Sequence, residues 1–107
     1  MKISYANSQL QKLCHDQRKA TQKLGADSAQ KLRNRIDDLA AAEKLADVRV
    51  GKPHPLVGDL KGCFAFSLAN GWRLVLRPID PPVNKTGDID WPAVRSVEIY
   101  KIENYHD

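Results

Sequence analysis

The sequence has little that would tie it to a membrane, a metal or the secretory route. No apolar run approaches the roughly 20 residues of a membrane helix, and the first ten residues lack the apolar stretch of a secretory signal. Cys14 and Cys63 are the only cysteines and fit no CxxC or Cys/His metal-binding spacing. We therefore expect a cytoplasmic protein without metal or cofactor, whose thiols act as small apolar groups.

The length bounds the architecture. A chain of 107 residues and 12.0 kDa, 42% hydrophobic, fits one domain. A domain of this size buries roughly two-thirds of the surface that its unfolded chain exposes. This is enough for a hydrophobic core that needs no disulfide or metal ion to stabilise it. We predict a single domain over residues 1–107.

The positive charge is unevenly distributed. Seventeen Lys and Arg against thirteen Asp and Glu give a net charge of +4. Eight of these cations but only two of the carboxylates lie in residues 1–36, whereas the remainder is slightly acidic. Such a basic segment favours an acidic partner, either nucleic acid or an acidic protein, or it is simply a solvated helix face.

The first half predicts a strand and two helices. A short strand over 2–6 would place Ile3 and Tyr5 on one face. The capping box Ser8-x-x-Gln11 predicts a helix start, and Gly25 suits a C-terminal cap. A second box, Asp27-x-x-Gln30, predicts a second helix, which the apolar spacing continues to about residue 46. Together they would form a helical hairpin.

The second half predicts strands. Residues 51–62 hold three glycines and two prolines and are expected to be a loop. Alternating strands over 63–68 and 72–77 flank Asn70-Gly71, a strong hairpin signal. The proline-rich 78–93 segment is expected to connect to a last strand over 94–102. The order β-αα-βββ predicts an α+β fold with helices packed on an antiparallel sheet.

Three segments of the second half carry polar, reactive side chains. His54, Asp59 and Lys61 precede the first hairpin strand, Arg73 and Arg77 share the non-core face of the second, and Tyr105 and His106 follow the last strand. A base, an acid and cations for a phosphorane are the groups that RNA cleavage requires. Each residue also has a plainer interpretation: a solvated histidine, a salt-bridge arginine or a loop residue.

Three stretches carry a family resemblance. HPLVGDLKG (54–62), FSLANGWRLVLRP (66–78) and VEIYKIENYHD (97–107) resemble the HigB-type killer toxins of the RelE/ParE superfamily, in type II toxin–antitoxin systems. The resemblance implies a metal-independent endoribonuclease that cuts message on the ribosome and so inhibits translation and growth. It also implies a HigA-like helix-turn-helix antitoxin, through which the complex would bind its operator DNA.

The resemblance also implies roles for individual residues. Arg73 would neutralise the scissile phosphate, His106 would act as acid or base, Tyr105 would stack on a base or position the phosphate, and His54 would be a second acid/base or orienting group. Lys61 would contact a phosphate. Apart from the resemblance, charge alone makes Arg77 on the hairpin a candidate phosphate contact, and it makes Arg33 and Arg35, expected on the outer faces of the helices, candidate contacts to ribosomal RNA. One departure is Asn104, where many relatives have Asp; Asn can position a neighbour but cannot act as a base, and Glu103 is a possible substitute.

Two other functions fit parts of the pattern. ParE relatives share the fold but inhibit DNA gyrase without a nuclease site, and the His/Tyr ending and basic hairpin favour the nuclease over this alternative. A DNA-binding helix-turn-helix in the first half fits poorly, because the expected helices are too long and a full sheet follows them.

Overall fold

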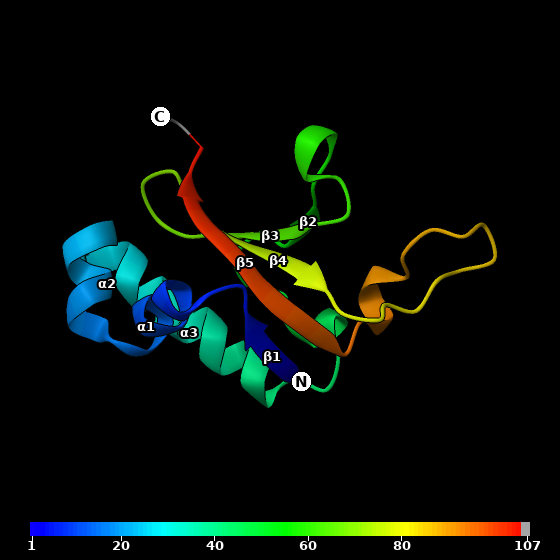
Figure 1. Cartoon of the computed structure of the whole chain (residues 1–107), viewed down its shortest axis with the longest axis horizontal. Coiled ribbons are helices and arrows are strands. Elements are labelled where there is room, and N and C mark those ends of the chain that lie inside the picture. The colour runs from blue at the N-terminus through cyan, green and yellow to red at the C-terminus, as the bar shows by residue number, and fades with distance from the viewer. Residues whose placement is uncertain (106–107) are drawn as a thin grey trace.

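A five-stranded sheet with helices on one side organises the computed structural model, which describes residues 1–105 (Figure 1). The helices are α1 (Ser8–His15), α2 (Gln17–Leu24) and α3 (Ala26–Ala41), and the strands are β1 (Lys2–Tyr5), β2 (His54–Pro55), β3 (Phe64–Ser67), β4 (Trp72–Pro78) and β5 (Ser96–Asn104). The spatial order is β1-β5-β4-β3-β2, in which β1 runs parallel to β5 and the other pairs are antiparallel. The α+β class is confirmed, with one more helix and one more strand than expected. The sheet is not wholly antiparallel as predicted, because β1 adds to it as a parallel edge strand.

The core lies between the helix layer and the sheet. Leu32 and Leu39 of α3 belong to the same buried cluster as Phe66, Leu74 and Ile99 of the sheet. Ile3 and Tyr5 pack against this cluster from β1, which confirms that they share a face. Burial of these side chains fixes the helices on one face and leaves the other without a helical cover.

The first predicted helix is in fact two helices. Asp16 is extended, with φ −118° and ψ 100°, and its carboxylate accepts the Lys19 N–H at 3.1 Å, so it caps α2. The start was also misplaced by one residue, because the Asn7 side chain accepts the Leu10 N–H at 2.9 Å and is the N-cap of α1. A side chain that accepts a hydrogen bond from a backbone N–H replaces the bond that this N–H would make in a continuous helix. At Asp16 the side-chain bond forms, and the helix is interrupted there.

The second predicted helix begins earlier and ends earlier than expected. Gly25, at φ +86°, is the N-cap of α3, so Asp27 lies inside the helix and Gln30 donates to Asn34 instead of forming a capping box. The helix ends at Ala41. Beyond it the Asp47 carboxylate accepts the N–H groups of Glu43 and Lys44 at 3.1 and 3.2 Å, which removes these amides from a helical ladder.

The hairpin forms as predicted, and the flanking loops hold more structure than expected. Asn70 and Gly71 have φ of +56° and +83°, the left-handed region that a tight turn of this kind needs. The expected loop at 51–62 contains the short edge strand β2, and β5 begins and ends two residues later than predicted. The proline-rich connection projects from the body, and Trp91 anchors it to Phe64 with ring centroids 5.1 Å apart (Figure 1). No helix within residues 1–105 is long and apolar enough to cross a membrane.

A buried serine ties α3 to the hairpin. The Ser28 hydroxyl donates to the Ala69 carbonyl at 2.7 Å and accepts the Ala69 N–H at 3.1 Å, and Ser28 is fully buried. We predict that Ser28→Ala lowers the free energy of unfolding by about 1–3 kcal/mol, because both Ala69 groups lose their partner. Urea denaturation measures this. Ser8→Ala, at an exposed non-capping serine, is the matched control and should stay within about 0.5 kcal/mol; equal losses would contradict the assignment.

Candidate functional site

The alternation of β4 creates a candidate site on the face opposite the helices. Leu74 and Leu76 are fully buried in the core, so Arg73 and Arg77 lie on the other face, as predicted. Val75 lies between the two arginines and is also fully buried, although it belongs to no part of the main core cluster. The face therefore has an apolar floor with cations on both sides.

The register with β5 gives each arginine a carboxylate. Arg73 directly opposes Glu103, and Arg77 directly opposes Glu98. The Arg73 Nη2 to Glu103 Oε2 distance is 3.2 Å, and Arg77 Nε donates to Glu98 Oε1 at 2.9 Å. This hydrogen bond raises the pKa of the Arg77 guanidinium above its usual value. Directly opposed side chains share a face, so both ion pairs lie on the helix-free side of the sheet.

Three aromatic–cation contacts complete this surface. A register shift between Val75 and Leu76 leaves Tyr100 without a directly opposed residue. The Arg77 guanidinium lies 4.1 Å from the centre of the Tyr100 ring, and Lys101 Nζ lies 5.4 Å from it. The Arg73 guanidinium lies 5.0 Å from the centre of the Tyr105 ring. We call this surface the open face and define it by Arg73, Arg77, Glu98, Tyr100, Lys101, Glu103 and Tyr105.

Arg73 is the most constrained cation of the open face. Its side chain is only 19% exposed, compared with 48% for Arg77. Its Nε is buried without a hydrogen-bond partner in the described part of the chain, and Glu103, which holds it, also lies 3.5 Å from Lys101 Nζ. Charge-assisted pairing to Glu103 and the Tyr105 ring fix the guanidinium in one position. This arrangement suits a group that must meet a phosphate at a defined point.

Asn104 places Tyr105 beside Arg73. Its side-chain amide donates to the Asn70 carbonyl at 3.1 Å, and the Tyr105 N–H donates to the Gly71 carbonyl at 3.2 Å. Both bonds tie the end of β5 to the hairpin turn. The structure thus brings together two predicted residues, Arg73 and Tyr105, and gives Asn104 a positioning contact. His106 lies outside the described residues.

His54 and Lys61 lie toward the far edge of the sheet. His54 is exposed on β2 and opposes Ala65, which in turn opposes Val75, so its register places it on the open-face side. Its Nδ1 lies 2.7 Å from the Lys52 carbonyl oxygen. Lys61 is exposed and borders a hollow with residues of the 87–91 segment. Within residues 1–105, no hydrogen bond or ion pair links either side chain to Arg73.

The two helix arginines have different surroundings. Arg33 is exposed on α3, as expected for the outer face. Arg35 is only 7% exposed, and its nearest carboxylate, that of Asp38, lies 3.5 Å away. The expectation that Arg35 lies on a solvated outer surface is wrong. A Cβ added to Gly51 would lie 3.4 Å from Arg35 Cδ, so the chain near Gly51 covers the arginine.

Sequence reasoning missed three members of the open face and undervalued a fourth. Glu98, Tyr100 and Lys101 were not singled out, and Glu103 was considered only as a substitute base. The acidic residues on β5 were a usable signal, because strands that face arginines favour opposed carboxylates. Their partners depend on the register, which the shift at Tyr100 changes.

Both thiols are at least partly buried, which agrees with the prediction that they act as small apolar groups. Cys63 is buried and Cys14 is partly buried, and burial raises the pKa of the Cys14 thiol to about 12. His15 does not pair with Cys14; its Nε2 lies 2.8 Å from the Tyr5 hydroxyl. Residues 1–105 contain no cluster of three or more metal-ligating side chains.

Solved toxin structures share this fold. The YoeB–YefM complex from Staphylococcus aureus matches with a TM-score of 0.58 and 17% identity, covering 100% of this chain and 98% of that chain. A YoeB/ParE toxin from Agrobacterium tumefaciens matches with a TM-score of 0.56 and 21% identity, covering 98% and 99%. No protein-family model and no curated protein matches the sequence. At these identities the likeness establishes the fold, which is that of YoeB/ParE-type toxins over the whole chain.

The two ion pairs of the open face should differ in strength. Glu103→Gln is expected to lower the free energy of unfolding by about 1–2 kcal/mol, because it leaves the enclosed Arg73 unpaired. Glu98→Gln should cost under about 0.5 kcal/mol, since Arg77 is half exposed and water replaces its partner. Urea denaturation at neutral pH measures both variants. Equal costs, or the reverse order, would show that Arg73 is not held by Glu103.

The raised pKa of Cys14 predicts slow thiol chemistry. In a Cys63→Ala background at about pH 8, the thiolate fraction of folded Cys14 is expected to be about 1,000-fold below that of the unfolded chain. Its reaction with a disulfide reagent should be at least about 100-fold slower than in urea and should accelerate as pH rises toward 12. Labelling at the unfolded rate would disprove the assignment.

Proposed function

We propose that this chain is the toxin of a type II toxin–antitoxin system and cuts messenger RNA on the ribosome, which arrests translation and growth. The observation that carries the proposal is the Arg73–Glu103–Tyr105 cluster: a fixed guanidinium beside an exposed aromatic ring, on the helix-free face of a YoeB/ParE-type fold. A guanidinium recognises a phosphate through several donors at once, and an exposed ring gives an unstacked base a surface to stack on.

The chemistry would proceed without a covalent enzyme intermediate. A base removes the proton of the 2′-hydroxyl, the 2′-oxygen attacks phosphorus, and the bond from phosphorus to the 5′-oxygen breaks as that oxygen takes up a proton. Arg73 would stabilise the charge that develops on the phosphorane. His106 is our candidate for acid or base, with Glu103 as the nearest described carboxylate to Arg73. Arg77 and Lys101 would hold the flanking phosphates.

Three predicted residues have a peripheral part in this proposal. The register places His54 on the open-face side, where it would orient the RNA rather than touch the scissile phosphate. Lys61 and the exposed Arg33 would contact more distant phosphates. Arg35 is left out, because its buried side chain cannot reach an RNA strand.

An antitoxin would restrain the activity. One of the fold neighbours is a toxin in complex with its partner, YefM, which supports a protein partner for this chain. We propose a HigA-like helix-turn-helix partner on the strength of the family resemblance, with operator DNA bound through that partner. A small reading frame of this type beside the gene would support the pairing.

Removing the fixed guanidinium should abolish cleavage. We expect Arg73→Ala to lower the rate of message cleavage in a translating extract by about 100-fold or more, since a preorganised donor to the phosphorane is lost. The matched control is Arg95→Ala, which removes an exposed arginine paired with Glu43 and should retain the wild-type rate. Thermal unfolding confirms that both variants fold.

The same preparation separates the two candidate activities. If the chain cuts no message but blocks supercoiling by DNA gyrase, the gyrase-inhibitor alternative replaces this proposal. Full cleavage by the Arg73→Ala variant would remove Arg73 from the site.

A further inference from the structure

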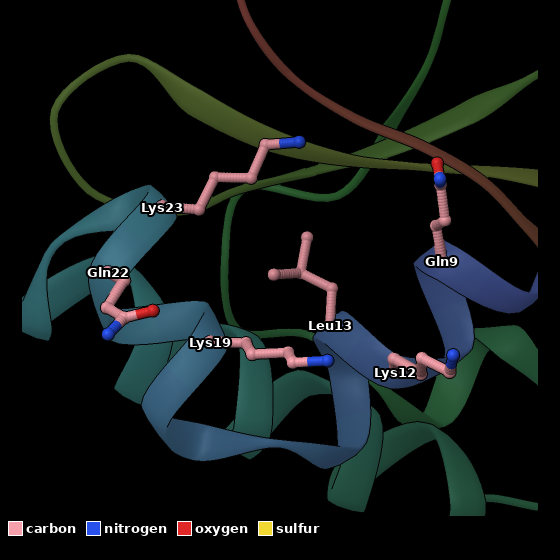
Figure 2. A pocket seen from close by; sticks show the side chains of 6 residues that line it. All are labelled: Gln9, Lys12, Leu13, Lys19, Gln22 and Lys23. Carbon is pink, nitrogen blue, oxygen red and sulfur yellow. The ribbon is translucent and has the colours of Figure 1, made fainter.

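A hollow on the helical part of the described chain is lined by lysines and differs in composition from the open face. It measures about 580 Å³ and lies at the elbow where α1 meets α2. Figure 2 shows the three lysine side chains arranged around Leu13, with a glutamine on each side. We call it the lysine hollow and define it by its six lining residues: Gln9, Lys12, Leu13, Lys19, Gln22 and Lys23.

The cations of the lysine hollow lack the carboxylates that the open face has. The ion pairs found within residues 1–105 involve Arg35, Arg73, Arg77, Arg95 and Lys101, and none involves a lysine of the hollow. The carboxylate of Asp16, between the two helices, caps α2 through the Lys19 backbone amide. Lys19 and Lys23 stand one helical turn apart, a like-charge spacing that disfavours the isolated helix.

We infer that the lysine hollow is a docking surface for the phosphate backbone of double-stranded RNA, separate from the cleaving face. None of its six lining residues is acidic or aromatic, so it offers charge and amide donors but no ring for a base to stack on. Duplex RNA is recognised through shape and phosphates, which matches this chemistry. The choice of RNA as the partner rests on the proposed function. The observation that the hollow is positively charged and lacks acidic lining residues does not depend on that function.

An acidic protein segment is the less fitting occupant. Protein interfaces centre on apolar and aromatic side chains and are depleted in lysine, whereas nucleic-acid interfaces are polar and strongly positive. Leu13 is the one apolar residue of the lining and is itself almost fully buried. The hollow therefore offers a protein partner one apolar side chain, almost fully buried and surrounded by lysines.

The test compares two charge-matched triple variants of the full chain. Lys12→Gln with Lys19→Gln and Lys23→Gln removes the hollow's cations, and Lys2→Gln with Lys44→Gln and Lys85→Gln removes three exposed lysines elsewhere. Fluorescence anisotropy measures the affinity for a labelled RNA duplex of about 16 base pairs. We expect the first variant to bind at least about tenfold more weakly and its log affinity–log salt slope to fall by about 2–3. The second variant should stay within about twofold of wild type.

Three results would overturn the inference: equal weakening by both variants, retention of duplex binding by the first, or loss of binding to poly-L-glutamate with duplex affinity unchanged. The outcome is independent of cleavage. A chain that cuts no message, yet loses duplex RNA only in the first variant, refutes the proposed function and leaves the docking surface standing. Conversely, if the chain cleaves message and the first variant binds duplex RNA as tightly as wild type, the docking surface alone is refuted.

Discussion

The pairing of β4 with β5 is the constraint on which both faces of the sheet depend. Because side chains alternate along β4, burial of Leu74 and Leu76 under the helices forces Arg73 and Arg77 onto the opposite face. The register then sets Glu103 and Glu98 directly across from them. A shift by one residue would expose the leucines and bury unpaired guanidinium groups, so the hydrophobic core and the candidate site specify the same register.

Positive charge lies on two surfaces of the chain that have different surroundings. On the open face, carboxylates and aromatic rings hold the arginines in fixed positions, at the expense of net charge. In the lysine hollow, the lysines form no ion pair within residues 1–105, and the like charges of Lys19 and Lys23 disfavour the helix. Fixed geometry suits chemistry at a single phosphate, whereas unpaired charge suits long-range attraction to many phosphates. The overall charge of +4 describes neither surface alone.

The sequence supported the local features of this fold and missed those that arise from tertiary contact. The Asn70-Gly71 turn and the alternation of β4 are short-range signals, and both were predicted correctly. The break at Asp16 was missed because the same residue could sit on a solvated helix face, and only its capping contact decides. The burial of Arg35 depends on the chain near Gly51, which no periodicity places. The positions of Glu98, Tyr100 and Lys101 on the open face depend on a register shift between β4 and β5. The sequence of neither strand alone predicts this shift.

The most direct test of the account is the chemical identity of the ends that the chain leaves on a message cut in a translating extract. Attack by the 2′-hydroxyl beside Arg73 predicts a 2′,3′-cyclic phosphate on the upstream fragment, a free 5′-hydroxyl on the downstream fragment, and no cut where that ribose carries a 2′-O-methyl group. Downstream fragments with a 5′-phosphate, or cleavage that ignores the 2′-O-methyl group, would contradict it.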